Sequence, residues 1–154
     1  MKKVSDFEGL NGNIVAFKEQ VSDAEKITFV GAPGVCTPFA ELFAYSVRDK
    51  KSCFITLTDI ESARSFKLTP QGMQLSEAVD PQADVVALLG GLSMPKAKVN
   101  VDELNEMIGK ILNENGKIIG LSYMDMFVEA GWENKVNFDC IINGTLIGSV
   151  NSYK

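Results

Sequence analysis

Four short, mostly apolar segments constrain the fold of this chain more than any other feature of its sequence. They occupy residues 26–30, 53–57, 84–89 and 117–121. A continuous apolar run such as Val-Val-Ala-Leu-Leu in the third segment is typical of a strand that is buried on both faces of a parallel sheet. Segments with helical spacing separate the four runs. The sequence therefore predicts an α/β fold in which helices cover a mainly parallel sheet.

The expected architecture is a three-layer sandwich of the Rossmann-like or flavodoxin-like kind. No linker or internal repeat divides the chain, so we expect a single α/β domain over residues 1–154. Near the C-terminus, Asn143-Gly144 is a strong two-residue hairpin signal between segments at 138–142 and 145–150. The sequence thus predicts an antiparallel hairpin that closes the fold.

Apolar spacing and capping residues predict the helices. The first helix has an apolar stripe at three-four spacing, made of Leu10, Ile14, Phe17 and Val21. A second helix is expected over 39–49. A third is expected after Asn100, which with Glu103 resembles a capping box, and Gly116 is its expected stop. Ser122 is expected to cap a further short helix.

Residues 60–81 fit two different structures. In one, residues 60–66 form a short helix capped by Asp59. In the other, residues 66–68 and 73–75 flank a Thr-Pro-Gln-Gly turn as a hairpin. The sequence leaves both open.

Composition excludes several classes of function. The net charge is −5 and no basic stripe is present, so nucleic acid is not an expected partner. No apolar run approaches the roughly 20 residues of a membrane span, and no signal peptide is evident. The chain has no histidine, which excludes Ser-His-Asp and Cys-His catalysis and most zinc sites. We therefore predict a cytoplasmic protein with no membrane partner and no metal site.

The three cysteines are odd in number and far apart, which favours reduced thiols over disulfides. Cys53 and Cys140 fall inside apolar strand segments and are expected to be inert. Cys36 has two interpretations. As a structural residue it packs beneath a turn like a small hydrophobic side chain. As a functional residue it is a thiolate, favoured by a helix N-terminus and available as a nucleophile, a redox centre or a ligand to a soft metal.

The turn around Cys36 is the most distinctive part of the sequence. Two glycines and a proline at positions 31–34 join the first strand segment to the second helix. Thr37 is the expected N-cap and Pro38 the first helical residue. Such a corner directs backbone N–H groups and the positive end of the helix dipole at one point, which suits an anion. It matches neither a P-loop nor a dinucleotide-binding turn.

Ligands of open parallel sheets bind beyond the carboxyl ends of the strands. The residues that follow those ends here are small or carry hydroxyl or carboxylate groups, and they define the predicted ligand-binding site: Gly31, Ala32, Pro33, Gly34, Val35, Cys36, Thr37, Asp59, Gly90, Gly91, Ser93 and Ser122. Turns and helix caps favour the same residue types without any ligand. For Asp59 an N-cap role is as well supported as hydrogen bonding to a ligand.

Three segments together resemble an uncharacterised archaeal protein family found largely in methanogens. They are Val30–Leu42 with its Pro-Gly-Val-Cys-Thr-Pro core, Leu57-Thr58-Asp59, and the Leu-Leu-Gly-Gly-Leu-Ser-Met-Pro stretch at 88–95. The resemblance runs over nearly the whole chain. It implies a cytoplasmic archaeal protein and transfers no catalytic residue, because the family has no assigned activity.

Three functional hypotheses follow from the sequence. The leading one is a protein that binds a small anionic or nucleotide-like ligand at the predicted site. The second is a thiol-dependent redox or transfer enzyme that uses Cys36. The third is an interaction module that forms a homodimer through its C-terminal hairpin or first helix. Whether the protein is an enzyme, and which cofactor it would use, stay open at this stage.

Overall fold

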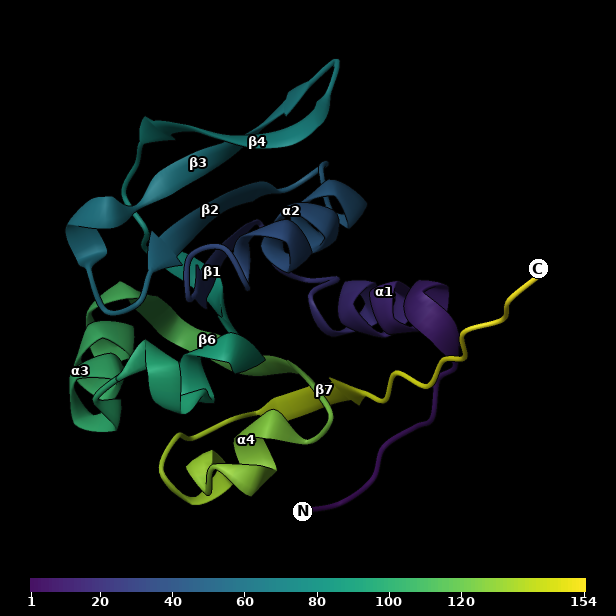
Figure 1. Cartoon of the computed structure of the whole chain (residues 1–154). Helices are drawn as coiled ribbons and strands as arrows, with labels where there is room; N and C mark the ends of the chain where they lie inside the picture. The colour runs from purple at the N-terminus through teal and green to yellow at the C-terminus, as the bar shows by residue number, and fades with distance from the viewer.

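A computed structural model describes all 154 residues and contains one seven-stranded sheet with helices on both faces (Figure 1). The strands are β1 (Lys26–Gly31), β2 (Lys51–Thr56), β3 (Arg64–Thr69), β4 (Gly72–Ala78), β5 (Ala83–Leu89), β6 (Leu112–Tyr123) and β7 (Cys140–Gly144). The α-helices are α1 (Gly9–Gln20), α2 (Thr37–Ser46), α3 (Val101–Ile111) and α4 (Met126–Glu129). Short 3₁₀ helices are η1 (Ile60–Ser62), η2 (Gly90–Ser93), η3 (Pro95–Ala97) and η4 (Trp132–Asn134).

The strand order is β4-β3-β2-β1-β5-β6-β7, and the five strands from β2 to β7 pair in parallel. Numbered among themselves, these five strands have the order 2-1-3-4-5 of flavodoxin-like sheets. The chain moves outward from β1 in one direction and from β5 in the other. The gap between the carboxyl ends of β1 and β5 is therefore the topological switch point, where open α/β sheets bind ligands. The predicted α/β class, the mainly parallel sheet and its four parallel strands are confirmed.

The two faces of the sheet have separate apolar cores. Phe17 of α1 and Phe43 of α2 pack on the face that also receives Phe29 of β1. On the opposite face, α3 and α4 pack with Trp132 against side chains of the central strands. Alternate residues of each buried strand point to opposite faces, so a strand buried on both sides has an unbroken apolar sequence. This confirms the predicted three-layer arrangement.

Only part of the predicted apolar stripe of α1 is buried. Phe17 and Val21 are buried, but Leu10 is 50% exposed. The buried polar residue Asn13 takes a place facing the core, where its side chain accepts a hydrogen bond of 2.6 Å from the Tyr123 hydroxyl. Apolar spacing predicted the helix but not which side its first turn faces.

The expected start of α3 is confirmed, but its expected end is wrong. The Asn100 side chain accepts hydrogen bonds from the backbone N–H groups of Asp102 and Glu103, at 2.9 and 3.1 Å. The helix ends at Ile111, and β6 begins at the next residue. Gly116 lies in an irregular part of β6, where a β-carbon would come 2.5 Å from a methyl group of Leu112. The glycine allows this close approach and does not stop the helix.

The hairpin interpretation of residues 60–81 is correct for most of that segment. Strands β3 and β4 pair antiparallel at one edge of the sheet, with Gly72 in the turn at a φ of +108°. The helical interpretation is correct only for the single turn η1. The Asp59 side chain caps this turn by accepting a hydrogen bond from Glu61 N–H.

The predicted C-terminal hairpin does not form. Strand β7 pairs with β6 in parallel, and residues 145–154 have no regular structure. Asn143 does not occupy a tight turn. Its side chain accepts hydrogen bonds from the Ser122 hydroxyl and Asp125 N–H, and donates one to the Asp125 carboxylate, each at 2.9 Å. These tertiary bonds hold the Asn-Gly pair in the strand, and Asp125, not Ser122, precedes α4 as its N-cap.

No helix has the length and apolar content needed to span a lipid bilayer.

Asp84 is expected to stabilise the sheet at neutral pH, because its carboxylate joins three segments. It accepts hydrogen bonds from Asn113 Nδ2 and from the backbone N–H groups of Glu25 and Lys26, at 2.9 to 3.1 Å. The hydrogen bond from Asn113 and those from the two amides hold the pKa of Asp84 below its usual value. Replacing Asp84 with Ala should lower the free energy of unfolding by about 1–2 kcal/mol, since the lost bonds are partly solvated.

The pKa of Asp84 is lower in the folded state than in the unfolded state, where it is near 3.9. The stabilisation by the Asp84 carboxylate is therefore complete above the unfolded pKa and is lost as the pH falls through the folded pKa. Urea unfolding of the wild-type protein and of Asp84→Ala between pH 3 and pH 7 measures the effect. The exposed residue Asp23 provides the control, because Asp23→Ala should change stability little at any pH. Equal losses for Asp84→Ala at pH 3 and pH 7 would contradict the electrostatic explanation.

Candidate functional site

The structure brings most of the predicted site residues to one edge of the sheet. Residues 31–37 leave β1, Gly90 begins η2 directly after β5, and Ser122 lies near the carboxyl end of β6. Asp59 follows β2 at the same edge, but its side chain caps η1. The shared edge follows from parallel pairing, which places the carboxyl ends of β1, β5 and β6 next to one another.

Helix α2 and its N-cap both begin one residue earlier than predicted. Cys36 occupies the N-cap position, Thr37 is the first helical residue, and no side chain caps the first turn. The Cys36 N–H donates to the Ala32 carbonyl at 3.0 Å, and its own carbonyl accepts from Ala40 N–H at 2.9 Å. The first amides of α2 therefore lack a side-chain acceptor, as expected for an N-terminus open to an anion.

The Cys36 side chain fills the switch point between β1 and β5. A β-carbon on Gly91 would lie 2.5 Å from Cys36 Sγ, and one on Gly31 would overlap the Cys36 β-carbon. The two glycines thus leave the space that the cysteine side chain occupies. Only 2% of Cys36 is exposed. The small residues at this corner serve the packing of a buried thiol.

Burial raises the pKa of the Cys36 thiol, and backbone hydrogen bonds from Ala32 and Gly91 lower it by a smaller amount, so the net shift is upward. The helix N-terminus alone would favour a thiolate, but desolvation of the charged form has the larger effect here. At neutral pH the group is a neutral thiol. Burial also raises the pKa values of Cys53 and Cys140.

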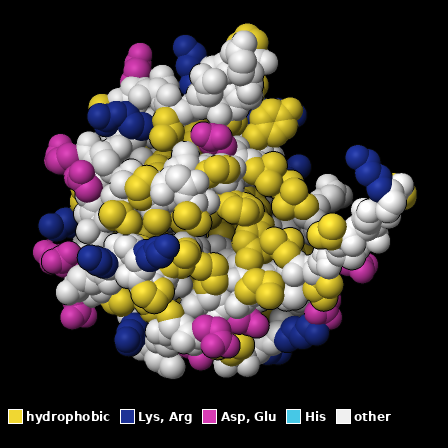
Figure 2. Space-filling model, viewed as in Figure 1, with side chains coloured by type: hydrophobic (Ala, Val, Ile, Leu, Met, Phe, Trp, Pro, Cys, Tyr) yellow, Lys and Arg dark blue, Asp and Glu magenta, His cyan; other side chains and the backbone are white.

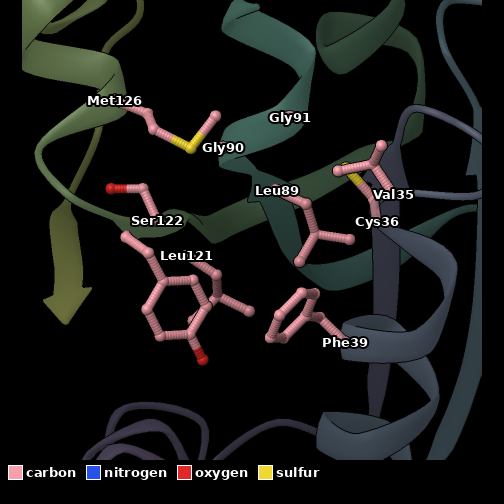
Figure 3. A pocket seen from close by; sticks show the side chains of 10 residues that line it. Val35, Cys36, Phe39, Leu89, Gly90, Gly91, Leu121, Ser122 and Met126 are labelled. Atoms are coloured by element: carbon pink, nitrogen blue, oxygen red, sulfur yellow. The ribbon is translucent and has the colours of Figure 1, made fainter. Parts of the chain in front are cut away.

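An apolar hollow opens beside Cys36, with a cavity volume of about 60 Å³. Its lining residues come from the turn after β1, from the ends of β5 and β6, and from helices α2, η2 and α4: Val35, Cys36, Phe39, Leu89, Gly90, Gly91, Leu121, Ser122, Tyr123 and Met126. Figure 3 shows Val35, Cys36 and Phe39 on one side of the hollow and Ser122 and Met126 on the other, with Leu89 between them. No lysine or arginine lines it.

Two aromatic side chains form part of this wall. The rings of Phe39 and Tyr123 lie 5.1 Å apart between centroids at an angle of 44°. The Tyr123 hydroxyl donates to Asn13, and the Ser122 hydroxyl to Asn143, so both hydroxyl groups have partners outside the hollow. The polar groups of the wall are thus engaged in fixing its shape.

Several predicted site residues lie outside the hollow. Gly31 is the last residue of β1 and Thr37 is the first residue of α2. Residues 32–34 belong to the turn between them, where Pro33 and Gly34 are exposed. Ser93 donates to the carbonyls of Gly90 and Met126, at 2.8 and 3.3 Å, and so ties η2 to α4. Asp59 and Ser93 have structural roles in this fold.

Five lining residues were missing from the predicted site: Phe39, Leu89, Leu121, Tyr123 and Met126. The prediction selected small and polar residues after strand ends, whereas these are large side chains within strands or in the first turn of a helix. Phe39 follows Cys36 by three residues, in the first turn of a helix. This spacing is the one local signal that places the Phe39 side chain on the same side of the helix as Cys36. No three Cys, Asp or Glu side chains are grouped closely enough to bind a metal ion together.

The fold and site define this chain as a flavodoxin-like α/β protein with a thiol-lined apolar hollow at its topological switch point. Residues 8–147 match the family model described as an uncharacterised protein conserved in archaea, DUF2124, and the chain belongs to that family. The resemblance found from the sequence is confirmed.

The relatives are similar over nearly their whole length. An uncharacterised protein of Methanothermobacter thermautotrophicus is 46% identical over 150 residues, which cover 97% of this chain and 98% of the relative. One from Methanocaldococcus jannaschii is 37% identical over 153 residues, covering 97% and 94%. The crystal structure of a protein of unknown function from M. thermautotrophicus superposes with a TM-score of 0.95 at 45% identity, covering 99% of this chain and 98% of that one.

Proposed function

We propose that this protein binds a small anionic molecule that carries a short apolar group, at the carboxyl ends of β1, β5 and β6. The observation that carries the proposal is the apolar hollow at the switch point, immediately beside the uncapped N-terminus of α2. The apolar group would enter the hollow, and the anionic group would lie at the turn formed by residues 31–37. The free thiols suit a reducing compartment, and we propose a cytoplasmic location.

The size of the hollow limits the ligand. A volume of about 60 Å³ is small beside the roughly 300–1,000 Å³ of pockets that enclose drug-sized ligands. It accommodates a group of a few non-hydrogen atoms, while the remainder of the ligand stays outside. A complete nucleotide would therefore have to bind mostly on the surface. Because no cation lines the hollow, the charge belongs at the helix N-terminus, where the dipole favours it.

The test uses four probes that separate charge from apolar contact: isovalerate, isobutanol, inorganic phosphate and adenosine monophosphate. Isovalerate, which combines a carboxylate with a branched alkyl group, should raise the melting temperature the most. At 100 times its dissociation constant a ligand stabilises by about 2.7 kcal/mol, which corresponds to several degrees for a chain of this size. Equal stabilisation by isobutanol would contradict the anionic part of the proposal.

A matched pair of variants locates the site. Val35 lines the hollow and is 52% exposed, while Val15 on α1 is 45% exposed and lies outside it. Val35→Trp should block the hollow and abolish stabilisation by isovalerate, and Val15→Trp should leave it unchanged. Stabilisation that persists in Val35→Trp, or no response to any probe in the wild-type protein, would refute the proposal.

The thiol-dependent alternative has less support. Such an enzyme needs a reactive thiolate, whereas the thiol of Cys36 is buried and its pKa is raised. Cys36 is better suited to forming the floor of the binding site, as a soft and polarisable group in contact with a ligand.

A further inference from the structure

The last ten residues, 145–154, form a C-terminal arm that leaves the body of the protein after β7 (Figure 1). Four large apolar side chains of the arm are exposed: Leu146 (66%), Ile147 (93%), Val150 (101%) and Tyr153 (96%). The arm carries no charge before Lys154. Its only hydrogen bonds join its own residues to one another. A largely uncharged segment that exposes four large apolar side chains and has no hydrogen bond to its own body is unusual, because a folded chain normally buries such side chains.

The same chain presents an apolar face over α1 and α2, close to where the arm departs. Hydrophobic side chains gather in the middle of this face, and charged side chains lie mainly around its margin (Figure 2). The exposed large apolar side chains of the two helices include Leu10 of α1 and Tyr45 of α2, and we name this surface the α1–α2 face. An apolar centre with a charged rim is the usual composition of a protein–protein contact surface.

We propose that the protein forms a two-fold homodimer in which the C-terminal arm of each protomer lies across the α1–α2 face of its partner. Each chain supplies both an apolar arm with no hydrogen bond to its own body and an apolar face beside which that arm departs. A reciprocal exchange satisfies the two surfaces at once and closes the assembly, as a two-fold axis requires.

The dimensions and the relatives favour this occupant. Ten extended residues reach about 33–36 Å, whereas the twelve residues of α1 are about 18 Å long, so the arm can cross α1 and reach α2. The superposition on the M. thermautotrophicus crystal structure covers 99% of this chain, so most of the arm lies within the matched region. An arm that is matched in the relative and yet has no hydrogen bond to its own body fits one that a second chain holds in place.

Sedimentation equilibrium of the full chain tests the proposal. At tens of micromolar the mass should be twice the 16.8 kDa of one chain. The double variant Ile147→Asp/Val150→Asp, and separately Leu10→Asp, should each raise the dimer dissociation constant by about 100-fold or more, because each would bury an unpaired carboxylate. Leu68→Asp is the control, since Leu68 is as exposed as Leu10 (51% against 50%) but lies on β3, and this variant should leave the dimer intact.

Mixing the two classes of variant tests the reciprocal contact. A protomer with Leu10→Asp has an intact arm, and a protomer with Ile147→Asp/Val150→Asp has an intact face, so the mixture should dimerise at least 10-fold more tightly than either variant alone. A monomeric wild-type chain at 100 μM, a dimer that survives the arm or face variants, oligomers larger than two, or no recovery on mixing would each overturn the proposal. None of these results depends on ligand binding in the hollow.

Discussion

Replacing Phe17 with alanine should be among the most destabilising single changes in this protein, with a loss of about 3–5 kcal/mol in the free energy of unfolding. Phe17 is fully buried, and its ring lies 5.0 Å from that of Phe43 and 5.8 Å from that of Phe29. It therefore joins α1 to α2 and to the centre of the sheet. Truncation removes these contacts and leaves a cavity among side chains from three elements, which cannot all move to fill it.

Guanidinium unfolding followed by circular dichroism measures this loss. Val15→Ala is the matched control, because Val15 lies on the same helix two residues before Phe17 but is nearly half exposed. It should cost well under 1 kcal/mol, as most surface substitutions do. Similar losses for the two variants would mean that the outward side of α1 is buried after all, and would contradict the role given to Phe17.

The sequence was sufficient to predict the fold class, because a strand that is buried on both faces of a sheet has a recognisable apolar sequence. Unbroken apolar runs located β1, β2, β5 and the central part of β6, and the parallel arrangement then required their carboxyl ends to share one edge. Local chemistry also predicted the Asn100 cap correctly, since that contact involves only neighbouring residues.

The errors arose where a distant residue determines the local structure. Asn143-Gly144 has the local signal of a hairpin turn, but hydrogen bonds of Asn143 with Ser122 and Asp125 keep it in a parallel strand. In the site, the prediction identified glycines by their freedom to turn. Gly91 is instead required by its contact with a side chain 55 positions earlier, which no local pattern reveals.

Truncation of Cys36 is expected to restore the stability lost in one of two glycine variants, Gly91→Ala, but not in the other, Gly31→Ala. Gly91→Ala should destabilise the protein by about 1–3 kcal/mol, because its new β-carbon would lie 2.5 Å from Cys36 Sγ. Cys36→Ala, at a cost of about 1 kcal/mol for the lost sulfur, removes that overlap. The next atom to the new β-carbon is then a Val35 methyl carbon at 3.4 Å, an ordinary contact. The double variant Gly91→Ala/Cys36→Ala should therefore be little less stable than Cys36→Ala alone.

Gly31 provides the internal control for this cycle. Its added β-carbon would overlap the β-carbon of Cys36, which alanine retains, so Cys36→Ala should not rescue Gly31→Ala. Chemical unfolding of the five variants and the wild type gives both coupling energies, and contacting residues commonly show 0.5–3 kcal/mol. Rescue of both glycine variants would mean that Cys36 stabilises this corner through general packing. Rescue of neither would mean that Cys36 Sγ does not fill the space between β1 and β5, and the hollow beside it would then have a different floor.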